Sequence, residues 1–208
     1  MTEVLIVGKT NMGKQLCLGG IVLENRRPVR LLPSKGIGHP LDKPIFLGEV
    51  WDMTFNEVPA SEITPPHTED VRAIRGRRIR RYADKELLQK LASCIEARTV
   101  EPQELFDSRI RFTRNARGYV SPRHGLPQYS TGFWRFRLPL IRIAEDDGSR
   151  FWVFGERGKM LLDVKYVGLE EDVPEELAPG TLLRFSLAHG FPDDPQRRCF
   201  LQLSGWFL

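Results

Sequence analysis

A chain of 208 residues in which 41% are hydrophobic has enough apolar side chains for a folded core, so the composition excludes a wholly disordered protein. Its 15 prolines and 18 glycines are spread between short apolar runs, which favours turns and short strands over a helical bundle. The formal net charge of +4 is modest, so a strongly cationic surface requires local clustering of arginine and lysine.

The sequence lacks the signals of a membrane or secreted protein. No apolar stretch approaches the roughly 20 residues that cross a bilayer, and the N-terminus has neither a basic region nor a cleavage site. Cys17, Cys94 and Cys199 are odd in number and far apart, which indicates neither a disulfide framework nor a zinc site. We therefore expect a cytoplasmic protein with buried free thiols.

The first part of the chain has the pattern of β-structure. Residues 3–8 are predicted to form a strand, and residues 20–23 and 29–32 a hairpin. Apolar side chains alternate with smaller or polar ones over residues 45–55, as in a strand with one buried face. Glu49 interrupts that alternation, which predicts a β-bulge.

Two helices are predicted in the middle of the chain. Apolar side chains recur at helical spacing over residues 83–97, with Asp84 near the start as a cap. A second, short helix is predicted over residues 101–106, with Pro102 in its first turn, where a missing backbone donor costs least. We interpret these helices as a connector between two halves.

Strand patterns resume after the connector, over residues 109–113, 133–144, 151–155, 161–167, 182–187 and 199–207. Residues 146–148 carry a hairpin-turn signal, and residues 190–196 form a turn rich in proline and aspartate. The chain is therefore predicted to be mainly β, with a β domain over residues 1–75, a basic segment and helical connector over 76–108, and a second β domain over 109–208. Five-stranded barrels of about this size bury a sheet without open edges.

A glycine-rich loop follows the first predicted strand. Residues 8–14 match Gly-x-x-x-x-Gly-Lys, the phosphate-binding loop of many nucleotide hydrolases. However, Gln15 stands where a hydroxyl side chain would hold magnesium, and residues 16–23 have a strand pattern where a helix is required. We therefore predict a connection between two strands, in which Lys9 and Lys14 contact phosphate as simple charges.

A dense cluster of arginine precedes the first predicted helix. Six arginines fall within ten residues: Arg72, Arg75, Arg77, Arg78, Arg80 and Arg81. Guanidinium groups bind phosphates in bidentate fashion and release counterions, so the cluster indicates a polyanion-binding segment. The alternative is a solvated, charged segment without a ligand.

A second basic stretch, residues 108–144, contains no aspartate or glutamate. Its arginines alternate with aromatic residues, the composition of grooves that hold single-stranded nucleic acid. Alternation places Trp134 in the core and Arg135 and Arg137 on the opposite face. By the same argument, Arg109 and Arg111 share one face.

Two tyrosines, Tyr119 and Tyr129, fall in the predicted loop of this stretch. Their rings could stack on bases, and the alternative is that they pin the loop to the sheet.

One short segment could carry catalysis. His67, Glu69 and Asp70 concentrate an imidazole and two carboxylates, which could bind a metal or act in acid-base chemistry. The sequence has no second acidic cluster at ligand spacing, and a local group of this kind is also typical of turns. We expect no enzymatic activity, no cofactor and no metal.

Six short motifs, taken in order, resemble the bacterial dual OB-containing domain family: residues 8–10 (GKT), 17–20 (CLGG), 29–31 (VRL), 48–51 (GEVW), 65–71 (PPHTEDV) and 131–134 (TGFW). The resemblance implies two OB-like barrels in one polypeptide and recognition of nucleic acid or nucleotides in an anti-phage setting. Because matching motifs fall on them, Lys9, Thr10 and His67 join the candidate residues. The arginine cluster at residues 72–81 is not part of the family pattern.

The sequence thus predicts a non-catalytic nucleic-acid-binding module. Its candidate contacts are Lys9, Thr10, Lys14, His67, Arg75, Arg77, Arg78, Arg80, Arg81, Arg109, Arg111, Tyr119, Tyr129, Arg135 and Arg137. Two alternatives stay open. One is a sensor that binds a nucleotide between the barrels through the Lys9 to Lys14 loop and His67. The other is an adaptor subunit of a multi-component system, whose arginines dock on an acidic protein partner.

Overall fold

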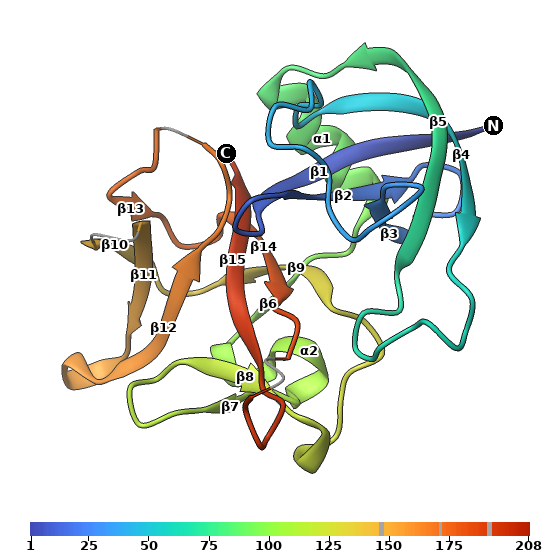
Figure 1. The fold of residues 1–208 in the computed structure, drawn as a ribbon. Coiled ribbons are helices and arrows are strands. Elements are labelled where there is room, and N and C mark those ends of the chain that lie inside the picture. Colours follow the sequence, from blue (N-terminus) through green and yellow to red (C-terminus); the bar gives the residue numbers. More distant parts are fainter. Residues whose placement is uncertain (146–147, 171, 191–192) are drawn as a thin grey trace. The chain divides into compact units, whose positions relative to one another are not determined.

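The computed structural model describes residues 1–145, 148–170, 172–190 and 193–208 (Figure 1). The chain divides into two compact units: residues 1–64, 68–96 and 207–208 form the first unit, and residues 65–67 and 97–206 form the second. Both are built mainly from strands, which confirms the predicted fold class. Within the described residues, no helix is long and apolar enough to span a membrane.

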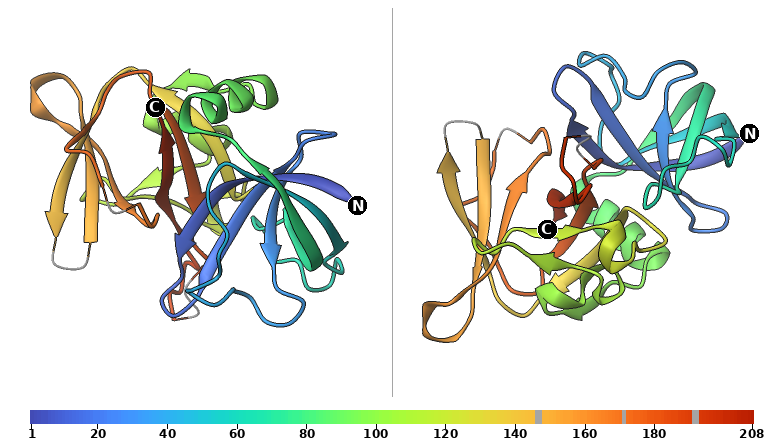
Figure 2. Two further views of the ribbon diagram at one scale, coloured as in Figure 1. Left: turned by 90° about the horizontal axis from the view of Figure 1, so that it is seen from above. Right: turned by 60° about the horizontal axis from the view of Figure 1, so that its bottom comes forward.

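The first unit is a closed five-stranded barrel, which Figure 2 shows from two further directions. Its strands are β1 (Thr2–Asn11), β2 (Leu16–Val22), β3 (Pro28–Leu32), β4 (Glu49–Glu57) and β5 (Asp70–Arg81), in the order β1-β2-β3-β5-β4. The pair β3 and β5 is parallel, and the other pairs are antiparallel. This order is that of a small Greek-key barrel of the OB type, as the resemblance implied.

Apolar side chains from alternate strand positions fill the barrel. The buried set contains Val4, Ile6, Leu18, Leu31 and Val71, which come from four of its strands. The predicted strand at residues 3–8 and the predicted hairpin are therefore confirmed as parts of β1, β2 and β3.

The arginine cluster forms a strand. Residues 70–81 are β5, which pairs with β4 along most of its length and with β3 at its beginning. Residues 76–81 were predicted to belong to the connector, whereas they are part of a strand of the closed barrel. The hydrogen bonds between strands come from the backbone, so β5 can form although most of its side chains are exposed arginines and few are apolar.

The predicted helix over residues 83–97 is α1 (Asp84–Cys94), which belongs to the first unit. It begins with a hydrogen bond from the backbone N–H of Ala83 to the carboxylate of Glu86. Leu87 and Leu91 are buried on one face, as the helical spacing predicted.

The second unit contains the remaining elements. Its strands are β6 (Arg98–Val100), β7 (Arg111–Phe112), β8 (Gly118–Val120), β9 (Thr131–Phe136), β10 (Leu140–Glu145), β11 (Gly148–Phe154), β12 (Met160–Tyr166), β13 (Glu176–Leu177), β14 (Leu182–Leu187) and β15 (Cys199–Phe207). Its short helices are η1 (Pro102–Glu104), α2 (Leu105–Ser108), η2 (Pro122–His124) and η3 (Glu156–Gly158).

One sheet of this unit has the order β13-β10-β11-β12-β15-β14-β9-β6, and β8 joins it by pairing with β15. The strand predicted over residues 133–144 is two strands, β9 and β10. Pro139 lies between them and has no N–H for a ladder bond, which explains the interruption. Of the two predicted turns, residues 146–147 and 191–192 lie outside the described residues.

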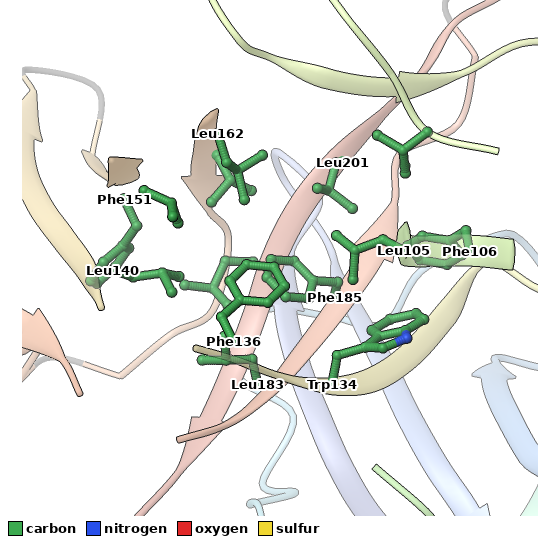
Figure 3. Close-up of a cluster of buried hydrophobic side chains, with 14 of the residues drawn as sticks. Leu105, Phe106, Trp134, Phe136, Leu140, Phe151, Leu162, Leu183, Phe185 and Leu201 are labelled. Carbon is green, nitrogen blue, oxygen red and sulfur yellow. The ribbon is translucent and has the colours of Figure 1, made fainter. Parts of the chain in front are cut away.

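Large aromatic side chains fill the core of the second unit (Figure 3). Phe136 stacks on Phe185 with 5.5 Å between ring centroids, and Trp134 lies 4.8 Å from Phe106. Trp134 is buried, which confirms its predicted place in the core. Cys94 and Cys199 are buried free thiols, as predicted, while Cys17 is only half-buried.

Replacing the fully buried Phe185 by Ala removes a ring from this core and leaves a cavity. We expect the free energy of unfolding to fall by about 3–5 kcal/mol. Urea titration followed by tryptophan fluorescence measures this, because Trp134, Trp152 and Trp206 lie in the second unit. Leu169→Ala, at an exposed position, is the control, and an equal effect of both substitutions would contradict this description of the core.

Candidate functional site

Two cations converge on an exposed aromatic ring in the first unit. The ring is Phe46, in the connection between β3 and β4, and 45% of this residue is exposed. Lys9 Nζ, from β1, lies 5.0 Å from the ring centroid, and Arg81 Cζ, from the end of β5, lies 5.3 Å from it. Both distances are typical of cation–π contacts. We call Lys9, Phe46 and Arg81 the Phe46 platform.

A buried carboxylate fixes the backbone beneath this platform. Glu49 Oε2 accepts a hydrogen bond of 3.1 Å from the backbone N–H of Phe46 and one of 2.9 Å from the indole of Trp51. Glu49 Oε1 accepts from Arg78 at 3.1 Å. Glu49 is completely buried, so its two oxygens connect the loop, β4 and β5 away from water.

These contacts determine the charge of Glu49. Burial alone raises the pKa of this carboxyl group, but the hydrogen bonds from Trp51, Phe46 and Arg78 and the charge of Arg78 outweigh burial, so the pKa lies below its ordinary value of 4.5. Glu49 is therefore ionised at neutral pH, and the charged form strengthens the bonds that it accepts.

Gly48 allows the chain to enter β4 at this point. Its φ is +79°, a conformation that side chains disfavour, and a Cβ atom would lie 2.9 Å from the carbonyl oxygen of Tyr82. The Gly48 carbonyl also accepts a 2.9 Å bond from the Tyr82 N–H. A larger residue would therefore displace the end of β5, which carries Arg81.

The arginines of the 72–81 cluster divide into two groups. Carboxylates pair with three of them: Arg72 with Glu62 at 3.1 Å, Arg78 with Glu49 at 3.1 Å and Arg80 with Glu3 at 3.0 Å. Among the described residues, no carboxylate pairs with Arg75, Arg77 or Arg81. All three of these residues are exposed.

Two bulges change the direction of the β5 side chains. The register with β4 shifts at Ile74 and again at Ile79, where one extra residue of β5 is inserted. Arg77 lies opposite Asp52, whereas its neighbour Arg78 lies opposite Trp51, so adjacent arginines occupy opposite faces of the strand. The cluster is therefore not a one-sided ladder.

The glycine-rich loop is a tight turn between β1 and β2. Met12 N–H donates to the Gln15 carbonyl at 2.8 Å, and β2 follows as a strand that pairs with β1. This confirms that the segment lacks the helix of a nucleotide-hydrolase loop. Lys14 is exposed in the turn, as its predicted role requires.

Two other predicted contacts are buried. Thr10 lies within β1, and the ring of His67 lies 3.9 Å from that of His189 in the second unit. The structure thus presents neither side chain at the surface.

The carboxylates near His67 have structural partners. Asp70 forms a bidentate pair with Arg30 at 2.5 Å, and Glu69 is buried. In the described ranges, no group of three histidine, cysteine or acidic side chains could hold a metal ion.

The tyrosines of the second unit have different surroundings. The hydroxyl of Tyr129 donates to Asp107 at 2.9 Å, which agrees with the alternative that this residue pins its loop. Burial and the Asp107 carboxylate raise the pKa of Tyr129. Tyr119 is half-buried, and Arg198 Cζ lies 5.6 Å from its ring, although Asp194 pairs with Arg198 at 2.7 Å.

No described contact joins the four predicted arginines of the second unit. Arg111 donates to the carbonyls of Ser108 and Ile110, and Arg135 donates to the carbonyl of Gly180. Arg109 and Arg137 are exposed. The first unit therefore holds the better defined cationic site.

Phe46 and the role of Glu49 were not predicted from the sequence. A signal for Phe46 existed, because the alternation that assigned Ile45 and Leu47 to the buried face assigns Phe46 to the outer face. Glu49 attracted attention only as an interruption of that pattern. The predicted bulge in this strand is wrong, because the register shift beside Val50 comes from an extra residue, Ile79, in β5.

Comparison with known proteins supports the architecture. The family model of the dual OB-containing domain matches residues 2–206, nearly the whole chain. No curated protein gives a significant match.

Glu49→Gln tests the role of the buried carboxylate. Because the pKa of Glu49 is lowered in the folded protein, its ionised form stabilises the fold above pH 4.5, and this contribution disappears as pH falls through the lower, folded-state pKa. We expect the substitution to reduce the free energy of unfolding by about 1–3 kcal/mol at pH 7. The difference from wild type should shrink on acidification below pH 4.5.

Urea unfolding over a pH series measures this difference. Glu3→Gln is the matched control, because Glu3 forms an exposed ion pair with Arg80 that contributes little. A Glu49→Gln effect that is equally large at all pH values would refute the ionic role.

Proposed function

The chain belongs to the dual OB-containing domain family, and from this we propose that it is a non-catalytic module that binds single-stranded nucleic acid at the Phe46 platform. Barrels of the OB type bind oligonucleotides at their strands and loops. The observation that carries the proposal is the exposed ring of Phe46 with Lys9 and Arg81 near it.

The chemistry of the platform matches what a single strand offers. Every base has a π-face that stacks on an aromatic ring, and each phosphate has a charge that a nearby cation neutralises. Lys9 and Arg81 bring two charges within about 5 Å of the ring, so one nucleotide can use both kinds of contact.

Further unpaired cations on the first unit extend this site. Arg77 is exposed on β5, and Lys14 is exposed in the β1–β2 turn, a loop that OB barrels use for binding. We propose that they neutralise phosphates on either side of the stacked base.

The remaining parts of the sequence prediction are proposals of the same kind. Arg109, Arg111, Arg135 and Arg137 stay predicted contacts on the second unit. A cytoplasmic location, the absence of catalysis and a role in defence against phage likewise stay predictions.

Binding of labelled single- and double-stranded DNA and RNA, measured by fluorescence anisotropy across a salt series, tests the proposal. Phe46→Ala removes one stacking contact, worth about 1–3 kcal/mol, so we expect Kd for a single strand to rise by roughly five- to 150-fold. Arg81→Ala should also weaken binding and reduce the slope of log K against log salt by about 0.7.

Each variant has a matched control in the same unit. Leu41→Ala removes another exposed apolar side chain of the β3–β4 connection, and Lys85→Ala removes an exposed cation of α1. Both controls should bind as wild type does. Equal affinities for Phe46→Ala and Leu41→Ala would contradict the platform, and failure of the wild type to bind any probe at low salt would favour the protein-docking alternative.

A further inference from the structure

The first unit contains a pocket that the proposed function does not use. Its volume is about 230 Å³, and β2, β3, β4, β5 and the β3–β4 connection all contribute to its walls. The apolar wall includes Leu18, Leu31, Ile45, Trp51 and Met53. Four of these side chains, Leu18, Leu31, Ile45 and Met53, are members of the barrel core, so the pocket is continuous with the interior of the barrel.

One polar side chain of the pocket is deeply buried. His39 is only 3% exposed, and its backbone N–H and carbonyl pair with Leu16, which fixes its position. Its ring nitrogen Nε2 lies 2.6 Å from the carbonyl oxygen of Leu31. The other ring nitrogen, Nδ1, is buried without a hydrogen-bond partner among the described residues.

The Leu31 contact determines which ring nitrogen carries the proton. A carbonyl only accepts, so Nε2–H is the donor, and in the neutral ring Nδ1 is then an acceptor. Burial, followed by the charge of Lys43, lowers the pKa of His39 despite the Leu31 bond, which keeps the ring neutral at pH 7. His39, in the wall of the pocket, therefore carries a buried acceptor that has no donor among the described residues.

The charged side chains of the lining are cationic. Lys43 and Arg75 both line the pocket, and Arg75 has no carboxylate partner among the described residues. Neither aspartate nor glutamate contributes to the lining that the structure describes. A ligand with a negative group beside its apolar part is thus favoured over a neutral or cationic one.

We propose that this pocket binds a single nucleotide unit, with the base against Trp51 and Met53, an N–H of the base donating to His39 Nδ1, and the phosphate at Lys43 and Arg75. A base supplies the flat apolar surface and the N–H donor, and the phosphate supplies the charge. The volume is below the roughly 300 Å³ at which drug-sized sites begin, so it suits one base and excludes a stacked pair.

This site goes beyond the platform, because none of its lining residues belongs to the Phe46 platform. The pocket could take a free nucleotide from solution or one nucleotide of a bound strand. Both ligands present a base, a sugar and a phosphate, and the two arms of the experiment distinguish between them.

Isothermal titration of the full chain with each of the four ribonucleoside monophosphates is the first arm. We expect saturable, one-site binding of at least one of them. His39→Gln retains a side-chain N–H for Leu31 but removes the acceptor, so it should weaken binding at least about tenfold. His39→Asn keeps an acceptor near the Nδ1 position and should restore most of the affinity.

Thermal unfolding of both His39 variants shows whether they fold. If His39 had only a structural role, the affinity of each variant for the monophosphate would fall in proportion to its loss of thermal stability. Lys43→Ala and Arg75→Ala leave His39 in place and should each weaken binding at least about threefold. Leu41→Ala, in the same connection but outside both sites, should leave monophosphate binding unchanged. Comparison of Phe46→Ala with His39→Gln in the oligonucleotide assay then distinguishes loss of the platform from loss of the pocket.

The second arm repeats the His39→Gln comparison with a single-stranded oligonucleotide. If wild type binds no monophosphate but His39→Gln weakens the oligonucleotide complex, the strand is the source of the nucleotide. If wild type binds no monophosphate and His39→Gln leaves oligonucleotide binding unchanged, the proposal is overturned. Monophosphate binding that none of the pocket substitutions alters overturns it as well.

Discussion

The buried carboxylate of Glu49 is the interaction on which the surface of the first unit depends. It accepts hydrogen bonds from the Phe46 backbone, the Trp51 indole and Arg78, and it is ionised because these donors outweigh the cost of burial. A buried charge without partners is expensive, so the three donors and Glu49 require one another. Together they hold the β3–β4 connection against β4 and β5.

That connection carries both proposed binding sites. Phe46 forms the platform, and His39 and Lys43 line the pocket a few residues earlier in the chain. β5 completes each site, because Arg81 reaches Phe46 and Arg75 reaches the pocket. A connection fixed by a buried carboxylate and a strand paired on both edges are rigid supports, which limits the entropy lost when a ligand binds.

Local patterns in the sequence predicted the parts of the fold that depend on neighbouring residues. Alternation of apolar and polar residues predicted β1 to β3 and the buried Trp134, and helical spacing of apolar residues predicted α1. The strand pattern after Gln15 correctly excluded the helix of a nucleotide-hydrolase loop. The hydrophobic pattern did not predict the second half of β5, because its many arginines give no apolar alternation although the backbone pairs with β4. It could not find the bond between Glu49 and Arg78, because residues 29 positions apart meet only through the pairing of β4 with β5. The pocket around His39 likewise requires four paired strands and the β3–β4 connection.

The most direct measurement for the central claim is photochemical cross-linking of a single strand that contains 5-iodouracil, followed by peptide mapping. Stacking of a base on an aromatic ring brings the two groups into van der Waals contact, the arrangement in which such cross-links form. Our account predicts an adduct at Phe46 that excess unlabelled strand abolishes. Adducts confined to the second unit, for example at Tyr119, would contradict it.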